Sequence, residues 1–420
     1  MTAGAALASC LSVALVACRG QAPTAQASDA SSSSTMSATS ETTTTLGTSS
    51  SSNDTTTSAD PPDSSEGLPE PSPLEQAARA EFTALTERGL PGALVGVHIA
   101  DTPVLRLALG VADVESKAPM QLDMYMRTGS VAKLMVGHAA LQLVASGSLD
   151  PDDTVDQYVP GVPNGTEISM RMLANHTAGL FNSIQDPFFR SQLNANPQLE
   201  LTTTDLLDHA FSFPSAPPGQ AFAYSNTNTI MLAEMARASA GLSLTELLES
   251  EVFSRYGTPS TGIPEDYRLP DPSPHGYRFG AQEGVVEYGD VFFDATDFGT
   301  SWTGAAGNLY STLDDLLTLA KPLASGAGLP DEVRAELDQW VSDPADPSFR
   351  YSFCLQDFDG AVGHGGDVPG FSSFVAYAPS TDASVVVLTN LSNFADEWPS
   401  PAEQLGRRLL QAIEDDPPSP

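Results

Sequence analysis

The chain has 420 residues and a formal net charge of -35, because 53 acidic residues face only 18 Lys and Arg residues. This charge would repel a nucleic-acid backbone or an anionic membrane surface, which argues against both as partners of the folded part. The length is enough for a sizeable core. Its cysteines, Cys10, Cys18 and Cys354, leave the folded part without a disulfide framework.

The N-terminus carries a short apolar run. Residues 4–17 are small and apolar and end in Leu15-Val16-Ala17-Cys18, which resembles a bacterial lipobox. The run is too short to span a bilayer and suits an export signal. We expect residues 1–18 to be a lipoprotein signal peptide and Cys18 to be lipidated, which would place an exported protein on the periplasmic or extracellular face of the cell envelope. Ordinary secretion is the alternative.

Residues 19–73 are dominated by Ser and Thr and have almost no large apolar side chain. Such a segment cannot bury enough surface to offset its chain entropy. We interpret it as a disordered linker between a membrane anchor and a folded domain.

The ordered part is expected over residues 74–415, followed by a short tail at 416–420. Helical periodicity covers 76–85, 131–145, 202–211, 229–240, 313–320 and 402–413, and strand patterns cover 93–100, 104–111, 371–378 and 383–390. Strands at both ends with helices between them predict an α+β fold. We expect one antiparallel sheet, flanked by N- and C-terminal helices and interrupted by a helical insertion over roughly 134–300.

The first chemical motif is Gly129-Ser130-Val131-Ala132-Lys133 at the start of an apolar helix. Lys133 would lie one turn after Ser130 on the same side, beside the helix N-terminus. It could act as a base if burial lowers its pKa from about 10.4 to about 7–8, a shift that costs on the order of 4 kcal/mol. A capping serine with a surface lysine is the ordinary explanation of such a pair. However, the chain has only two other lysines.

Two further motifs follow. In the first, Pro218-Gly219 introduces a loop with Tyr224 and Asn226. A neighbouring cation, Lys133, could lower the pKa of the Tyr224 phenol, and Asn226 could bind a substrate amide. In the second, Gly363-His364-Gly365-Gly366-Asp367 precedes a strand, and its glycines let a substrate backbone approach. His364 could orient or protonate a leaving group.

Together and in this order the three motifs resemble the S-x-x-K, Y-x-N and K-T-G set of serine β-lactamases and penicillin-binding proteins. The sequence is most similar to the class C β-lactamase and D-alanyl-D-alanine carboxypeptidase branch, where histidine can replace the third-motif lysine. Three other segments carry the same likeness, at 143–150 with 158–161, at 173–180 and at 305–312.

The resemblance implies a role for each matching residue. Ser130 would form an acyl-enzyme, Lys133 and Tyr224 would handle protons, and Asn226 would hold the substrate amide. The oxyanion hole would use the backbone N–H groups of Ser130 and Asp367. The remaining substrate-binding residues would be His364, Gly365, Gly366 and Trp302. Neither a metal nor a cofactor is implied, and the oligomeric state stays open.

Two departures from the family pattern affect the substrate. Gly365 stands where a threonine hydroxyl usually helps bind the substrate carboxylate, and Arg350 is the nearest candidate for the carboxylate-binding arginine. We expect a carboxypeptidase-like peptidase acting on cell-wall peptides. The alternatives are an esterase or D-amino-acid amidase, a β-lactamase, or a penicillin-binding sensor without turnover. The partner would be a small peptide, ester or β-lactam.

Overall fold

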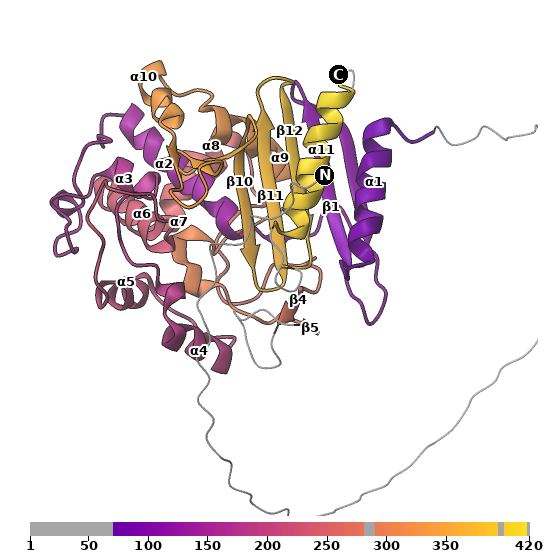
Figure 1. Ribbon diagram of the computed structural model, residues 1–420, viewed down its shortest axis with the longest axis horizontal. Helices are drawn as coiled ribbons and strands as arrows, with labels where there is room; N and C mark the ends of the chain where they lie inside the picture. The colour runs from indigo at the N-terminus through magenta and orange to yellow at the C-terminus, as the bar shows by residue number, and fades with distance from the viewer. Residues whose placement is uncertain (1–69, 281–289, 394–398, 418–420) are drawn as a thin grey trace, which may run out of the picture. The chain divides into compact units, whose positions relative to one another are not determined.

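The structure is a computed structural model that describes residues 70–280, 290–393 and 399–417 (Figure 1). Its centre is an eight-stranded antiparallel sheet in the order β2-β1-β12-β11-β10-β9-β8-β7. The first and last long strands pair with each other at Ala93–Ile99 and Ala383–Thr389, so both ends of the domain meet in one sheet. The strands are β1 Gly92–Ile99, β2 Thr102–Gly110, β7 Val341–Ser342, β8 Arg350–Tyr351, β9 Gln356–Phe358, β10 Ala361–Val368, β11 Phe371–Ala378 and β12 Ala383–Thr389.

Helices cover both faces of the sheet. Helices α1 (Pro73–Thr86) and α11 (Pro401–Asp415) pack together on one face, and α9 (Leu313–Ser325) packs on the other (Figure 1). Alternate residues of each strand therefore enter two separate cores. This arrangement explains why β12 is buried along its whole length and has an apolar run with no polar face.

The chain between β2 and α9 contains the insertion that was expected over roughly 134–300. It is mostly helical, but it also contains two short strand pairs, β3 with β6 and β4 with β5. Its helices are α2 Ala132–Ala145, α3 Met170–Ala174, α4 Pro187–Ala195, α5 Thr203–Phe211, α6 Asn226–Ala240, α7 Leu244–Leu248 and α8 Ser254–Tyr256; the strands are β3 Met126–Arg127, β4 Tyr277–Gly280, β5 Val291–Asp294 and β6 Tyr310–Ser311. The α+β class with an antiparallel sheet is confirmed.

The central helix of the insertion, α2, is buried from Ala132 to Leu143. A helix that is apolar all round belongs in a protein interior, and this one carries Lys133 into that interior with a side chain 0% exposed. In the described part of the chain, no helix has the length and apolar character needed to cross a bilayer. The signal peptide and linker predicted for residues 1–73 lie almost entirely outside the described residues.

Candidate active site

Ser130 sits in a 3-10 turn, Gly129–Val131, that leads directly into α2. Gly129 has φ +51°, a left-handed conformation that a residue with a side chain rarely adopts. The turn places the Ser130 hydroxyl 2.9 Å from Nζ of Lys133, one helical turn further on. The predicted pair therefore forms.

Lys133 has three hydrogen-bond partners of two kinds. Nζ lies 3.0 Å from Oδ1 of Asn226 and 2.9 Å from the Ala306 carbonyl, and both of these oxygens can only accept. A neutral amine has two N–H groups and one lone pair. When both N–H groups donate to these acceptors, the lone pair is left for the Ser130 hydroxyl proton.

The electrostatic surroundings favour this neutral amine. Burial lowers the pKa of Lys133 to about 7, because a charged group loses its hydration there. The side chain therefore loses its proton near neutral pH and can serve as a base for Ser130.

Tyr224 completes the group around the serine oxygen, but in a different state from the one predicted. Its hydroxyl donates to Oγ of Ser130 over 3.0 Å, and Nζ of Lys133 lies 4.9 Å from its ring centroid. The pKa of Tyr224 is raised, mainly by burial. The expectation that Lys133 lowers this pKa is not met, because burial raises it and outweighs the lowering by the hydrogen bond to Ser130. Tyr224 therefore keeps its proton and donates a hydrogen bond to Ser130, and Lys133 is the stronger candidate for the base.

The H-G-G-D motif forms the wall opposite Ser130. The sequence placed it before a strand, whereas residues 361–368 are β10 itself, paired with β11. Consecutive glycines disfavour a strand, and pairing with β11 overrides that preference. A Cβ built on Gly129 would lie 2.9 Å from the backbone nitrogen of Asp367, and one built on Gly366 would lie 3.0 Å from that of Ser130. The two predicted oxyanion-hole nitrogens are therefore on facing segments in close contact.

His364 is buried and already hydrogen-bonded on both ring nitrogens. Nδ1 donates to the Gly365 carbonyl over 2.5 Å, which leaves Nε2 to accept from the Tyr351 hydroxyl at 3.0 Å. Burial lowers the pKa of His364 to about 3. In this arrangement His364 has no proton to give a leaving group, and it fixes the wall beside Tyr224.

Two aromatic residues of this region were missing from the predicted site. His176 packs on Tyr224 with ring centroids 4.4 Å apart, and Tyr351 packs on His176 at 4.8 Å. Burial lowers the pKa of His176 well below its usual value. His176 belonged to a segment that carried the family likeness and could have been found from it. Tyr351 stood in an apolar run with no distinguishing signal.

The remaining predicted residues lie in different surroundings. Asn226 begins α6 and touches Lys133, as expected for a residue next to the nucleophile. Trp302 is 9% exposed, and its indole nitrogen donates to the Gly299 carbonyl at 3.2 Å. It therefore packs in the core, four residues before the Ala306 carbonyl that binds Lys133. Gly365 adds no side chain to the wall.

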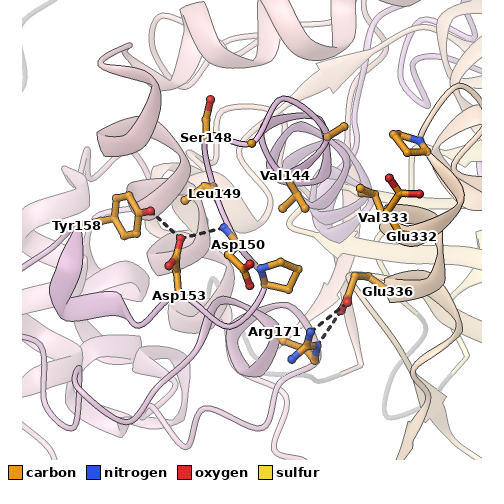
Figure 2. A pocket seen from close by; sticks show the side chains of 14 residues that line it. Val144, Ser148, Leu149, Asp150, Asp153, Tyr158, Arg171, Glu332, Val333 and Glu336 are labelled. Carbon is orange, nitrogen blue, oxygen red and sulfur yellow. Dashed lines mark hydrogen bonds and ion pairs between the residues drawn. The ribbon is translucent and has the colours of Figure 1, made fainter.

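A separate pocket of about 550 Å³ lies at the far end of α2, beside Val144 and Ala145 (Figure 2). Ser130 precedes this helix of 14 residues, so the pocket is about 20 Å from the nucleophile. Several of the polar groups that line it pair with one another. Arg171 contacts Glu336 at 2.7 Å, and Tyr158 donates to Asp153 at 2.7 Å. We interpret this pocket as a structural ion-pair network and not as part of the active site. Among the described residues, no group of His, Cys, Asp and Glu could hold a metal ion.

Fold and geometry define a class of protein: a serine hydrolase in which a buried lysine contacts the candidate nucleophile. Residues 77–407 match the Beta-lactamase family model, and the chain belongs to this family. Esterase EstB of Burkholderia gladioli is 28% identical over 73% of this chain and 88% of that protein.

Solved structures share the fold. D-amino acid amidase from Ochrobactrum anthropi SV3 superposes with a TM-score of 0.72 at 23% identity, over 82% of this chain and 99% of that one. D-stereospecific amidohydrolase from Streptomyces sp. gives a TM-score of 0.69 at 24% identity, over 80% and 97%.

Proposed function

We propose that this protein hydrolyses esters or amides through an acyl-enzyme on Ser130 and does not require a substrate carboxylate. The observation that carries the hydrolytic step is the environment of Lys133, whose Nζ lies within hydrogen-bond distance of two obligate acceptors and of Oγ of Ser130. A neutral amine that donates to both acceptors directs its lone pair at Ser130.

The reaction can be followed atom by atom. Lys133 takes the Ser130 proton while Oγ bonds to the substrate carbonyl carbon, and the resulting oxyanion lies between the N–H groups of Ser130 and Asp367. When the bond to the leaving group breaks, Tyr224 donates its proton to that group and recovers one from Lys133. Water then attacks the acyl-enzyme by the same route, so Ser130 is regenerated and the acid is released.

The preference for esters and amides over carboxypeptidase substrates rests on what could bind a carboxylate. Gly365 provides no hydroxyl. Arg350, the nearest arginine in the sequence, lies 3.1 Å from Asp357 and stacks over Trp340 at 5.0 Å. Its charge is already engaged on the protein. The esterase and amidase names among the related proteins support the same proposal.

A substrate comparison tests the proposal. Purified protein would be assayed on p-nitrophenyl butyrate, an N-acetyl amino-acid p-nitroanilide, a D-Ala-D-Ala peptide and a chromogenic cephalosporin, with Ser130→Ala as the matched control. We expect ester hydrolysis with a burst of product, absent from Ser130→Ala, and at least about tenfold lower kcat/KM on the D-Ala-D-Ala peptide, since one lost charged contact has about that effect. The D-Ala-D-Ala peptide as best substrate would instead identify a carboxypeptidase. Covalent labelling by a penicillin without turnover of any substrate would identify a binding protein.

We also propose that the protein is an exported lipoprotein anchored through Cys18. The support is the sequence alone: an apolar run ending at Leu15-Val16-Ala17-Cys18, followed by the Ser/Thr-rich segment. In a bacterial host, Cys18→Ala should abolish incorporation of a fatty-acid label and move the protein from the membrane fraction to a soluble one. Incorporation that persists in Cys18→Ala would disprove anchoring at this residue.

A further inference from the structure

Two carboxyl groups, each with a buried oxygen, lie beside the proposed oxyanion hole and have no part in the mechanism above. Asp367 is on β10, and its Oδ2 is buried without a hydrogen-bond partner. Glu403 is in the first turn of α11, is 1% exposed, and its Oε2 is likewise buried without a partner. A buried carboxylate oxygen without a donor is costly, so this pair calls for an explanation.

The two carboxylates share one face of the sheet. A Cβ built on Gly365 would lie 3.3 Å from Oε2 of Glu403, so position 365 faces α11. Asp367 is two residues further along the same strand and therefore faces the same side. Its partner on β11 is Ser372, whose hydroxyl accepts from the backbone nitrogen of Ala402 at the start of α11. Positions 365 and 367 are about 7 Å apart along the strand, a spacing that one small group between the two carboxylates can bridge.

This face adjoins the place where a substrate carbonyl would sit. Strand β9 pairs with β10 only at Ala361–Gly363, so the edge of β10 from His364 onward is not covered by β9. The backbone nitrogen of Asp367 lies against Gly129 at that edge. A substrate held there would have its carbonyl beside the N–H of Asp367 and a neighbouring substituent within reach of the Asp367 side chain.

The protein's own arginines compensate only part of the negative charge that these two carboxyl groups can carry. Oε1 of Glu403 accepts from Nε of Arg407 at 2.8 Å, and Arg278 acts on Asp367 through its charge. Burial raises the pKa of both carboxyl groups despite these arginines. Each group still has one oxygen that accepts nothing, and a cation between them would supply donors to both.

We propose that Asp367 and Glu403 form an acidic subsite that binds a protonated amino group of the substrate. The inference rests on the proposed function and narrows it: the preferred substrates are esters or amides that carry a primary ammonium group close to the reacting carbonyl. Gly365 has no side chain, so no group of β10 lies between its backbone and Oε2 of Glu403 at this position. A substrate carboxylate would meet two acids here, and the net charge of -35 would attract a cationic substrate from a distance.

Two pairs of achiral substrates, each differing in one positive charge, test the subsite at pH 7.5. Glycine p-nitroanilide and N-acetylglycine p-nitroanilide place or remove the charge on the acyl side. 2-Aminoethyl butyrate and propyl butyrate do so on the leaving-group side. We expect kcat/KM to favour the ammonium compound about 10- to 100-fold in one of the pairs, the range expected for hydrogen bonds to a charged group. Equal kcat/KM within both pairs would overturn the subsite.

Variants test whether the two carboxyl groups cause the preference for the ammonium substrate. In Glu403→Gln and, independently, in Asp367→Asn, the ratio of kcat/KM within the preferred pair should fall toward one. The matched control is Glu336→Gln, another buried glutamate that contacts an arginine but lies at the far end of α2; its ratio should equal that of the unmodified protein. A ratio that survives in both subsite variants, or falls equally in the control, would contradict the proposal.

The two failures can be told apart. If Ser130→Ala still hydrolyses p-nitrophenyl butyrate, the proposed function itself is wrong. If Ser130→Ala is inactive and the unmodified protein treats charged and uncharged substrates alike, only the acidic subsite is wrong.

Discussion

Lys133 donates a hydrogen bond to Oδ1 of Asn226 over 3.0 Å, so the side chain that activates the nucleophile is tied to one expected to hold the substrate. The contact also orients the amide of Asn226. Its oxygen faces the lysine, and its NH₂ group is left to donate to a substrate carbonyl.

Asn226→Asp should shift the pH dependence of acylation. The change places a carboxylate about 3 Å from Nζ, and an opposite charge at that distance raises a lysine pKa by about 1–3 units. Lys133 must be neutral to act, so its acylation rate rises with pH through about 7. In the variant the midpoint should move to higher pH by a similar 1–3 units, measured from single-turnover rates between pH 5 and 10. Asn226→Ala is the control, because it removes the contact without adding charge. An unmoved midpoint in the Asp variant would show that Lys133 does not titrate in this step.

Lys133→Arg should be nearly inactive. Guanidinium keeps the positive charge but does not lose a proton in proteins, so a base is lost while a cation is retained. We expect acylation to fall by about 10²–10⁴-fold, the usual contribution of a general base, and Lys133→Ala to fall by a similar amount. Both would be measured by the rate of covalent labelling. An Arg variant within about tenfold of the unmodified protein, well short of a general-base loss, would transfer the base role to Tyr224.

The main elements of the fold could be predicted because local pattern and tertiary structure agree there. The expected strand at 371–378 is β11, and the helix expected at 402–413 lies within α11. β10 was missed because Gly363, Gly365 and Gly366 favour a loop and only pairing with β11 makes them a strand. Short strands β7 to β9 have two or three residues each, too few for a periodic signal.

Most residues of the site could be predicted from the sequence, but the protonation states of Tyr224 and His364 could not. Motif spacing brought Ser130 and Lys133 together because one helical turn separates them. The states of Tyr224 and His364 depend on burial and on partners distant in sequence. Lys133, buried on an apolar helix, gives up its charge, and Tyr351 occupies Nε2 of His364 from 13 residues away. The apolar helix around Lys133 already indicated the lowered pKa, whereas no pattern in the sequence predicts the contact between Tyr351 and His364.

The stability of the folded domain should not depend on the first seventy residues, whereas Ser72 should contribute to it. The Ser72 hydroxyl accepts from the backbone nitrogen of Glu75 at 3.1 Å and caps α1, while the Pro71 carbonyl accepts from Gln76 at 2.7 Å. A chain starting at Pro71 should melt like the full chain. A chain starting at Pro73 should lose about 1 kcal/mol, the usual value of such a cap. Differential scanning calorimetry of the three proteins decides this, and a lower Tm for the Pro71 chain would show that the preceding segment contributes to folding.

Gly366→Ala adds only one methyl group, but we expect it to lower kcat strongly. A methyl group at this position would lie 2.2 Å from the Thr128 carbonyl and 3.0 Å from the backbone nitrogen of Ser130, so β10 or the turn carrying Ser130 must move. Displacing an oxyanion-hole donor costs about 10²–10³-fold in kcat. Gly299→Ala is the matched control, because its new methyl would have no neighbour closer than 3.5 Å. Full activity of Gly366→Ala would place the oxyanion hole elsewhere.

Lys133 should also give the protein a pH-dependent stability that an uncharged replacement lacks. Its pKa is about 7 in the folded chain and about 10.4 in an unfolded one. Between these values the unfolded state holds one proton more than the folded state, so the free energy of unfolding rises with pH by up to about 1.36 kcal/mol per unit. Below pH 7 both states are protonated, and this contribution is absent. Lys133→Met removes the titration while retaining a buried side chain of similar length. Urea unfolding of both proteins from pH 6 to pH 9 should therefore show no change in their stability difference up to about pH 7. Above that pH the unmodified protein should gain steadily on the variant, by about 2–3 kcal/mol at pH 9. A difference independent of pH would mean that Lys133 keeps its proton in the folded protein, and the neutral amine facing Ser130 would have to be abandoned.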